Sequence, residues 1–163
     1  MFSLSQSSHY AIQALTLLLT AEPPVRFVRE IAEQAELPPA YLAKIFKRLA
    51  DHNIVVAKRG YRGGTTMSRD PKEISLWEIS VAIDGPEFLS HCLLGQATCS
   101  DERACPTHEF WKRNRGAVEA VLKKTSLADV LAFEKQRLTV KPKPGKPSKA
   151  SPGQSASLRQ KAR

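Results

Sequence analysis

Cysteine is scarce in this chain of 163 residues, which holds three, all between positions 92 and 105. The N-terminal stretch lacks the basic region of a secretory signal. The apolar stretch at residues 11–21 is interrupted by polar residues and is too short to span a bilayer. An odd number of cysteines without an export signal argues against a disulfide framework. We therefore expect a soluble, cytoplasmic protein whose thiols stay reduced.

The sequence also lacks the signatures of common enzymes. It has no glycine-rich phosphate loop, no nucleophile motif, no acid and base in a recognisable setting, and no C-x-x-C pair of redox thiols. No internal repeat is visible either. These absences argue against an enzyme and favour a binding or regulatory protein.

Acidic residues are absent from residues 139–163, which carry seven basic residues, so most of the formal net charge of +9 lies there. The charge of the whole chain is therefore no evidence for nucleic-acid binding by itself. Four prolines alternate with Lys, Ser and Gly, and apolar residues are few, which favours a disordered basic tail. We expect it to be solvated; weak contact with DNA phosphates is the alternative.

Three short amphipathic helices are predicted before residue 52. Apolar residues at helical spacing indicate helices over 9–21, 28–35 and 39–51, and Pro23-Pro24 ends the first. The third helix has an apolar stripe that consists of Leu42, Ile45, Phe46 and Leu49. Its opposite face carries Tyr41, Lys44, Lys47 and Arg48. Two short helices joined by a tight turn, the second basic on its outer face, are typical of a helix-turn-helix.

A short hairpin is predicted next. A β-branched run at residues 54–56 and a strand over 65–68 enclose a basic, glycine-rich tip at residues 58–64. Glycine lets the backbone approach a phosphate closely, and arginine suits the negative potential of a narrow minor groove. This pattern indicates a wing; an ordinary hairpin with a charged tip is the alternative. The residues expected to contact DNA are Tyr41, Lys44, Lys47, Arg48, Arg59, Gly60 and Arg62. A solvated face remains the alternative for each lysine.

The second half of the chain is predicted to be helical around an irregular segment. A helix over 76–83 ends at Asp84-Gly85-Pro86, a long helix runs from about 106 to 124, and a last one covers 127–137. Ser126 and Asp129 resemble a capping box at the start of the last helix. The long helix has an apolar face larger than a small domain needs, which indicates a helix–helix dimer interface. That face consists of Trp111, Val118, Val121 and Leu122.

The fold class expected from these elements is mainly α with a small β-hairpin. We assign residues 1–85 to a winged helix-turn-helix DNA-binding domain and residues 86–105 to a cysteine-containing loop that binds a cluster. Residues 106–138 form the dimerisation helices, and residues 139–163 form the disordered basic tail.

The three cysteines form one pattern with a histidine, C-x6-C-x5-C-x2-H, made by Cys92, Cys99, Cys105 and His108. Soft ligands gathered in so short a stretch suggest a metal or an iron–sulfur cluster. Long spacers let a loop wrap a cluster, whereas closed zinc sites more often use C-x2-4-C knuckles. A structural zinc, redox-active thiols and cysteines without function are the alternatives. His9 is a weaker candidate for a ligand that reaches across a dimer, and an ordinary polar residue is its alternative.

The order of these features resembles the Rrf-two family of bacterial transcriptional regulators, which includes IscR, NsrR and RirA. The resemblance covers residues 3–135 and is carried by Tyr41-Leu42, by Arg59-Gly60…Gly63-Gly64, and by the stretch CLLGQATCSDERACPTHEFW. It implies a repressor that binds a palindromic operator in double-stranded DNA as a homodimer. It also implies an iron–sulfur cluster, 2Fe-2S or 4Fe-4S, that changes DNA affinity in response to redox state, nitric oxide or iron supply.

Overall fold

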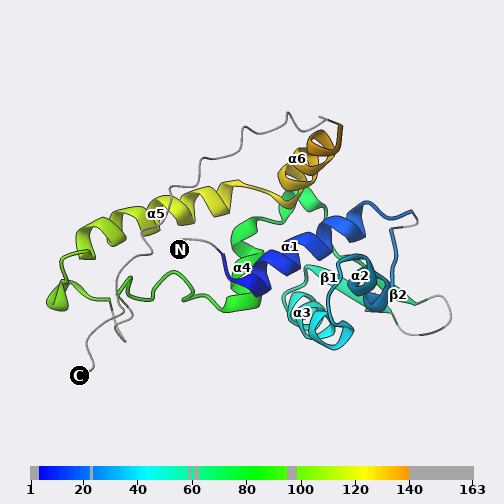
Figure 1. The fold of residues 1–163 in the computed structure, drawn as a ribbon, viewed down its shortest axis with the longest axis horizontal. Helices are drawn as coiled ribbons and strands as arrows, with labels where there is room; N and C mark the ends of the chain where they lie inside the picture. Colours follow the sequence, from blue (N-terminus) through cyan, green and yellow to red (C-terminus); the bar gives the residue numbers. More distant parts are fainter. Residues whose placement is uncertain (1–3, 23, 59, 61–62, 95–98, 140–163) are drawn as a thin grey trace, which may run out of the picture.

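The computed structural model describes residues 4–22, 24–58, 60, 63–94 and 99–139, except for the side chains at 103, 138 and 139. Its elements in chain order are α1 (Gln6–Leu19), α2 (Val28–Gln34), α3 (Pro39–Asp51), β1 (Val55–Lys58), β2 (Gly64–Met67), the 3-10 helix η1 (Pro71–Glu73), α4 (Leu76–Asp84), the 3-10 helix η2 (Asp101–Arg103), α5 (His108–Lys124) and α6 (Leu127–Thr139) (Figure 1). The predicted fold class is confirmed. The tail predicted over 139–163 lies almost wholly outside the described residues.

Helix α1 begins at Gln6, three residues earlier than predicted, because Ser5 caps it. The Ser5 hydroxyl accepts a hydrogen bond from the backbone N–H of Ser8 at 3.0 Å, which satisfies one of the free donors of the first turn. Helix α1 then lies across α2, α3 and α4 and contributes the middle of the core. Its fully buried apolar residues are Ala11, Ala14 and Leu15, with Leu18 almost as deep.

Helices α2 and α3 form the predicted helix-turn-helix. Glu36 takes a positive φ of 56° in the turn, and the Leu37 N–H bonds to the Ala32 carbonyl at 2.9 Å. Proline at the first position of α3 costs no helical hydrogen bond, so the helix begins where the sequence predicts. The predicted apolar stripe of α3 is buried, as expected: Leu42, Ile45, Phe46 and Leu49.

The wing is built on three segments rather than the two predicted. Strands β1 and β2 pair antiparallel, and Arg26 adds a bridge to β2 through two backbone hydrogen bonds with Thr65, of 3.1 and 2.7 Å. Gly64 has a φ of +146° at this junction, and a Cβ atom there would lie 2.7 Å from the Val25 side chain. Glycine at this position therefore permits the close packing of residues 25–26 against the base of the wing.

The C-terminal helices are tied to the DNA-binding half by a bridge between Ser75 and Ser126. The N–H of Leu127 bonds to the Ile74 carbonyl at 2.8 Å, and both of these side chains are fully buried. The capping box predicted for Ser126 and Asp129 is confirmed, with both reciprocal hydrogen bonds present. The core of the first 85 residues thus also takes in the start of α6.

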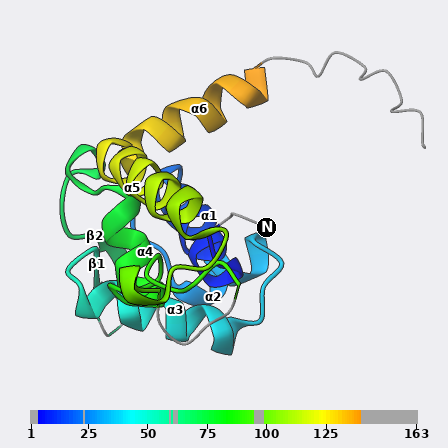
Figure 2. The ribbon, with the colours of Figure 1, turned by 90° about the vertical axis from the view of Figure 1, so that its left-hand side faces the viewer.

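Helix α5 runs beside α4, and the loop that precedes α5 lies at the end of the molecule opposite the wing (Figures 1 and 2). The apolar face predicted for α5 is divided. Trp111 and Leu122 are buried, whereas Val118 and Val121 are 37% and 62% exposed. Part of this face is therefore unpartnered within one copy of the chain.

Replacing Gly64 by alanine is expected to destabilise the protein. The added Cβ would need both a strained positive φ and displacement of Val25, and the strain alone costs about 1–3 kcal/mol. Urea unfolding would measure the loss. Gly60→Ala is the matched control, since Gly60 also has a positive φ but nothing within 4 Å of its Cβ position. Equal losses in the two variants would show that packing against Val25 is unimportant.

Candidate nucleic-acid interface and metal centre

The outer face of α3 is less uniform than its sequence pattern indicates. Lys44 and Lys47 are exposed, as predicted for residues that meet phosphates. Tyr41 is half-buried instead: its hydroxyl hydrogen-bonds to the Ser7 hydroxyl at 2.8 Å, and its ring meets Tyr10 edge-on. The prediction that Tyr41 shares the exposed face with the lysines is therefore corrected, because its ring completes the contact between α3 and α1.

Arg48 is exposed along part of its side chain, yet its guanidinium is engaged within the protein. Its Nη1 donates a hydrogen bond of 2.6 Å to the carbonyl of Ile83, in the last turn of α4. The last carbonyls of a helix have no partner inside that helix, so a guanidinium satisfies one of them here. Arg48 thus connects α3, the second helix of the helix-turn-helix, to α4, a contact that the sequence pattern does not indicate.

The C-terminal end of α4 is also joined to α1. The Asp84 carboxylate accepts hydrogen bonds from the hydroxyls of Ser5 at 2.7 Å and Ser8 at 2.8 Å. Gly85, with a φ of +88°, then ends the helix and turns the chain toward the cysteines. The sequence indicated a helix stop at this point but gave no sign of the contacts with α1.

The tip of the wing is described in part. Gly60 is exposed and takes a positive φ, and its carbonyl accepts a 2.8 Å hydrogen bond from the Gly63 N–H. Arg59 and Arg62 lie outside the described residues, so their contact with DNA stays a prediction.

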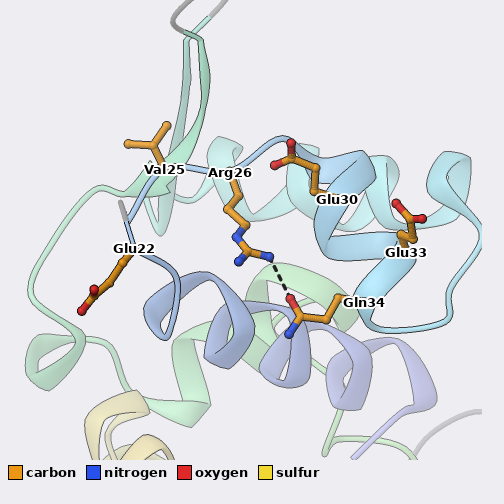
Figure 3. Close-up of a pocket in the computed structure, with 6 residues that line it drawn as sticks. All are labelled: Glu22, Val25, Arg26, Glu30, Glu33 and Gln34. Atoms are coloured by element: carbon orange, nitrogen blue, oxygen red, sulfur yellow. Dashed lines mark hydrogen bonds between the residues drawn. The ribbon is translucent and has the colours of Figure 1, made fainter.

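A hollow of about 560 Å³ beside the base of the wing is lined by Glu22, Val25, Arg26, Glu30, Glu33 and Gln34 (Figure 3). Arg26 hydrogen-bonds to Gln34 across it at 2.8 Å, and three carboxylates surround this pair. Carboxylates repel the phosphate backbone, so this side of α2 is unsuited to DNA. The exposed lysines of α3 offer the more favourable face.

Two of the predicted ligands lie together near the start of α5: the Cys99 sulfur lies 3.5 Å from Nδ1 of His108. The Cys105 thiol has the Thr107 hydroxyl as its side-chain partner. Cys92 is buried, whereas Cys99 and Cys105 are partly exposed. The Thr107 hydroxyl, 3.3 Å from the Cys105 sulfur, lowers the pKa of that thiol, and the Thr107 backbone and Cys92 add to the effect. A lowered pKa favours the thiolate that metals bind.

Cys92 also lines an apolar hollow of about 790 Å³ between the loop, α1 and α5. The indole N–H of Trp111 donates to the His91 carbonyl at 2.9 Å and so holds this part of the loop against α5. Asp84 and Ser5 line the same hollow, which brings the first cysteine close to the junction of α4 and α1.

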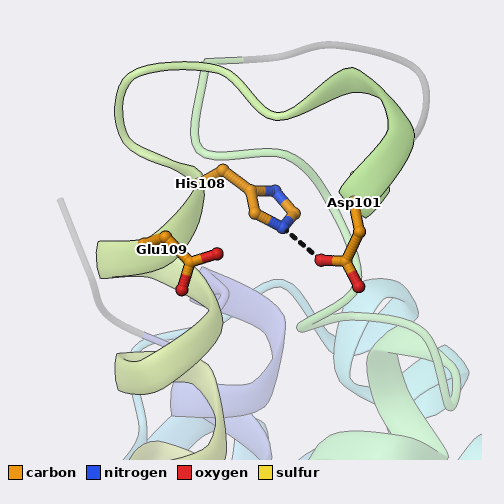
Figure 4. Close-up of side chains that lie close together, drawn as sticks. All are labelled: Asp101, His108 and Glu109. Carbon is orange, nitrogen blue, oxygen red and sulfur yellow. Dashed lines mark hydrogen bonds and ion pairs between the residues drawn. The ribbon is translucent and has the colours of Figure 1, made fainter.

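His108 is held by a carboxylate that the sequence analysis missed. Its Nε2 lies 2.8 Å from an oxygen of Asp101, which belongs to η2 (Figure 4). Lys112, one turn further along α5, bonds to both Asp101 oxygens at 2.8 and 2.9 Å. The hydrogen bond from Lys112, followed by that from His108, lowers the pKa of Asp101. In the sequence, the one sign of this hydrogen-bonded group is the helical spacing of His108 and Lys112.

Asp101, His108 and Glu109 have potential ligand atoms that all lie within 4.8 Å of one another. Among the described residues, the three thiols do not form so compact a group. Hydrogen bonds from His108 and Lys112 already engage the Asp101 carboxylate, so the acidic group is better explained as support for His108 than as a separate cation site. His9 is exposed on α1, and its role as a ligand stays a prediction.

A helix-turn-helix followed by a hairpin defines a winged-helix DNA-binding protein. Residues 4–132 match the family Rrf2, described as "Iron-dependent Transcriptional regulator". The chain therefore belongs to the Rrf2 (Rrf-two) family of transcriptional regulators, which confirms the resemblance seen in the sequence. In the part of the chain that the structure describes, no helix combines the length and apolar character needed to cross a membrane.

Known relatives include regulators with different names. The HTH-type transcriptional regulator IscR of Sodalis glossinidius is 28% identical over 133 residues, which cover 80% of this chain and 79% of that protein. The structure of CymR, the global cysteine regulator of B. subtilis, matches with a TM-score of 0.67 and 24% identity, covering 82% of this chain and 98% of that one. The structure of T. potens IscR matches with a TM-score of 0.65 and 23% identity, covering 86% and 94%. The two structural matches support the fold.

The exposed lysines and the engaged arginine of α3 should differ in how they affect DNA binding. For binding to a random duplex, the logarithm of the affinity falls linearly with the logarithm of the salt concentration. Lys44→Ala and Lys47→Ala are each expected to reduce the steepness of that line by about 0.9. Arg48→Ala should leave the slope unchanged, because its guanidinium is bonded to Ile83. Fluorescence anisotropy at several salt concentrations would measure each slope, with Lys135→Ala on α6 as control. A reduction for Arg48→Ala equal to that of the lysine variants would contradict this assignment.

Proposed function

We propose that this protein is a transcriptional repressor whose affinity for its operator is controlled by an iron–sulfur cluster. The observation that carries the proposal is the contact of Cys99 with His108 at the start of α5, with Cys105 three residues before His108 in the same segment. Cys92 lies earlier in the same loop, so four potential ligands come from one loop and one helix start.

The residues fit such a cluster chemically. Thiolates are the usual ligands of iron–sulfur clusters, and an imidazole in place of a thiolate raises the reduction potential. Four protein ligands would suit either a two-iron or a four-iron cluster. When bound, the group would supply sensitivity to redox state, nitric oxide or iron supply. Cys92, Cys99, Cys105 and His108 would hold it.

DNA recognition is assigned to α3 and the wing. Lys44 and Lys47 would contact phosphates, and Arg59 and Arg62 at the tip of the wing would enter the minor groove. The exposed valines of α5 favour a homodimer, and two related recognition helices would then read a palindromic operator with half-sites about 34 Å apart. A repressor would act by occupying that operator.

The proposed link between cluster and DNA runs through α4. Cys92 lines the same hollow as Asp84, and the last turn of α4 bonds to α1 through Asp84 and to α3 through Arg48. A cluster that repositions the loop would bias the position of this end of α4. The recognition helix would follow, and with it the spacing of the two helices in the dimer.

A thiol-based regulator is the second candidate. The lowered pKa and partial exposure of Cys105 favour it, since such thiols react readily with oxidants. A structural zinc is less favoured, because a tetrahedral ion needs its ligands mutually close, and the three thiols form no such group among the described residues.

The cluster can be tested through its ligands. Replacing any one of the three cysteines by alanine should abolish the visible absorption of anaerobically purified protein, because the chain has no other thiol. His108→Ala should leave a labile or spectrally altered cluster, and Ser100→Ala in the same loop serves as control. Iron and sulfide analysis completes the measurement. The proposal would be wrong if the purified protein were colourless and contained zinc, or if a triple-cysteine variant still contained stoichiometric iron and sulfide.

Control of DNA binding requires a comparison of two states. Cluster-loaded and cluster-free protein, each confirmed dimeric by light scattering, would be titrated with an operator selected from a random duplex library. Their affinities are expected to differ by about 5–150-fold, the usual range of allosteric coupling. Arg48→Ala should reduce this ratio, because it removes the bond between α3 and α4.

The matched control for that experiment is Lys47→Ala, which should weaken both states equally and leave the ratio unchanged. Equal affinity of the two wild-type states for every operator tested would make the cluster structural and remove the sensing function.

A further inference from the structure

We infer that Asp101 is a positioning residue that fixes the tautomer and ring orientation of His108 and so presents Nδ1 of the imidazole toward Cys99. The consequence for a cluster rests on the proposed function. The hydrogen bond between Asp101 and His108 is formed by the protein without any cluster.

The hydrogen-bond geometry determines which nitrogen carries the proton. A carboxylate has only acceptor atoms, so the Nε2 atom that lies 2.8 Å from Asp101 donates to it. In a neutral imidazole the other nitrogen, Nδ1, then keeps a free lone pair. That nitrogen lies 3.5 Å from the Cys99 sulfur. His108 is 4% exposed, so water competes little for either nitrogen.

Lys112 holds the carboxylate in place. Its Nζ bonds to both oxygens of Asp101, whose side chain is otherwise 70% exposed. Because His108 and Lys112 lie on one face of α5, Asp101 is fixed at two points and docks η2 onto the first turns of that helix. The segment between Cys99 and Cys105 is thereby attached to α5.

Glu109 provides an internal comparison. Its carboxylate lies in the same compact group but makes no hydrogen bond to His108 among the described contacts (Figure 4). A general effect of negative charge near the imidazole would involve both acids. A positioning effect requires Asp101 alone.

Histidines that bind metals commonly donate their second ring N–H to a carboxylate, which orients the ring and raises its basicity as a ligand. Removal of that partner typically costs 10–100-fold in metal affinity. The sequence pattern predicts His108 as a ligand, and the hydrogen bond to Asp101 would make Nδ1 rather than Nε2 the ligand atom.

The first test needs no cluster. Imidazole nitrogen shifts would be measured by long-range ¹⁵N NMR on full-length, cluster-free protein at mildly alkaline pH, where histidine is neutral. The His108 signals are assigned by their loss in His108→Gln. Wild-type protein should show the Nε2–H tautomer, and Asp101→Ala should show a mixture. Asp101→Asn, whose amide oxygen still accepts a hydrogen bond, should restore the wild-type pattern, and Glu109→Gln should not alter it.

The second test uses protein reconstituted with iron and sulfide. Asp101→Ala should lose its visible absorption in air about 10-fold faster than wild type, whereas Glu109→Gln should match wild type. An unchanged tautomer in Asp101→Ala, or an equal effect of Glu109→Gln in either test, would overturn the inference. If wild-type protein takes up no cluster, the proposed function fails, and the NMR comparison still decides the role of Asp101.

Discussion

Helix α4 fixes the N-terminal and C-terminal halves of the chain relative to each other, because it packs against α1, α3 and α5. Its inner face buries Ile79 and Ile83, and burial of such side chains contributes about 1.5–3 kcal/mol each. Its N-terminal end is fixed by the hydrogen bond from Leu76 to the Thr125 carbonyl, and its C-terminal end by the contacts of Asp84 with α1. A shift of α4 would therefore change the packing of the helices around it together.

This arrangement separates the cysteine-containing loop in space from the face that α3 and the wing form. The start of α5 lies at one end of the molecule, whereas α3 and the wing lie toward the other (Figure 1). No candidate ligand needs to touch DNA for the two sites to influence each other. The polar contacts at the end of α4 are few and directional, so small displacements there would reach α3 as a change of orientation. Apolar packing alone would allow more sliding between helices.

Sequence reasoning succeeded where the signal is local. The bounds of α3 and the capping box of α6 both arise from residues within a few turns of one another. It failed where partners are far apart in the chain: Tyr41 and Ser7 are separated by 34 positions, and Arg48 and Ile83 by 35. Contacts between residues so far apart produce no periodic pattern in the sequence. A polar residue on the outer face of a predicted helix is then assigned to solvent or to DNA. Asp101 was overlooked for a related reason, since a lone carboxylate in an irregular loop has no pattern of its own.

The bridge between Ser75 and Ser126 brings the chain back to the start of α4 after the segment that separates α4 from α6. The chain leaves the core at Asp84 and returns to it at Leu127, and these points are separated roughly by the length of α4, about 13 Å for nine residues. Between them, α5 packs against α4 and buries Trp111 and Leu122, so the irregular part of this segment is the loop between α4 and α5. Because the entropy of closing a loop grows only slowly with its length, residues can be inserted in or removed from that loop at little cost to the core. The same winged-helix domain could thus carry loops of different length and chemistry, each attached to it at the same two points.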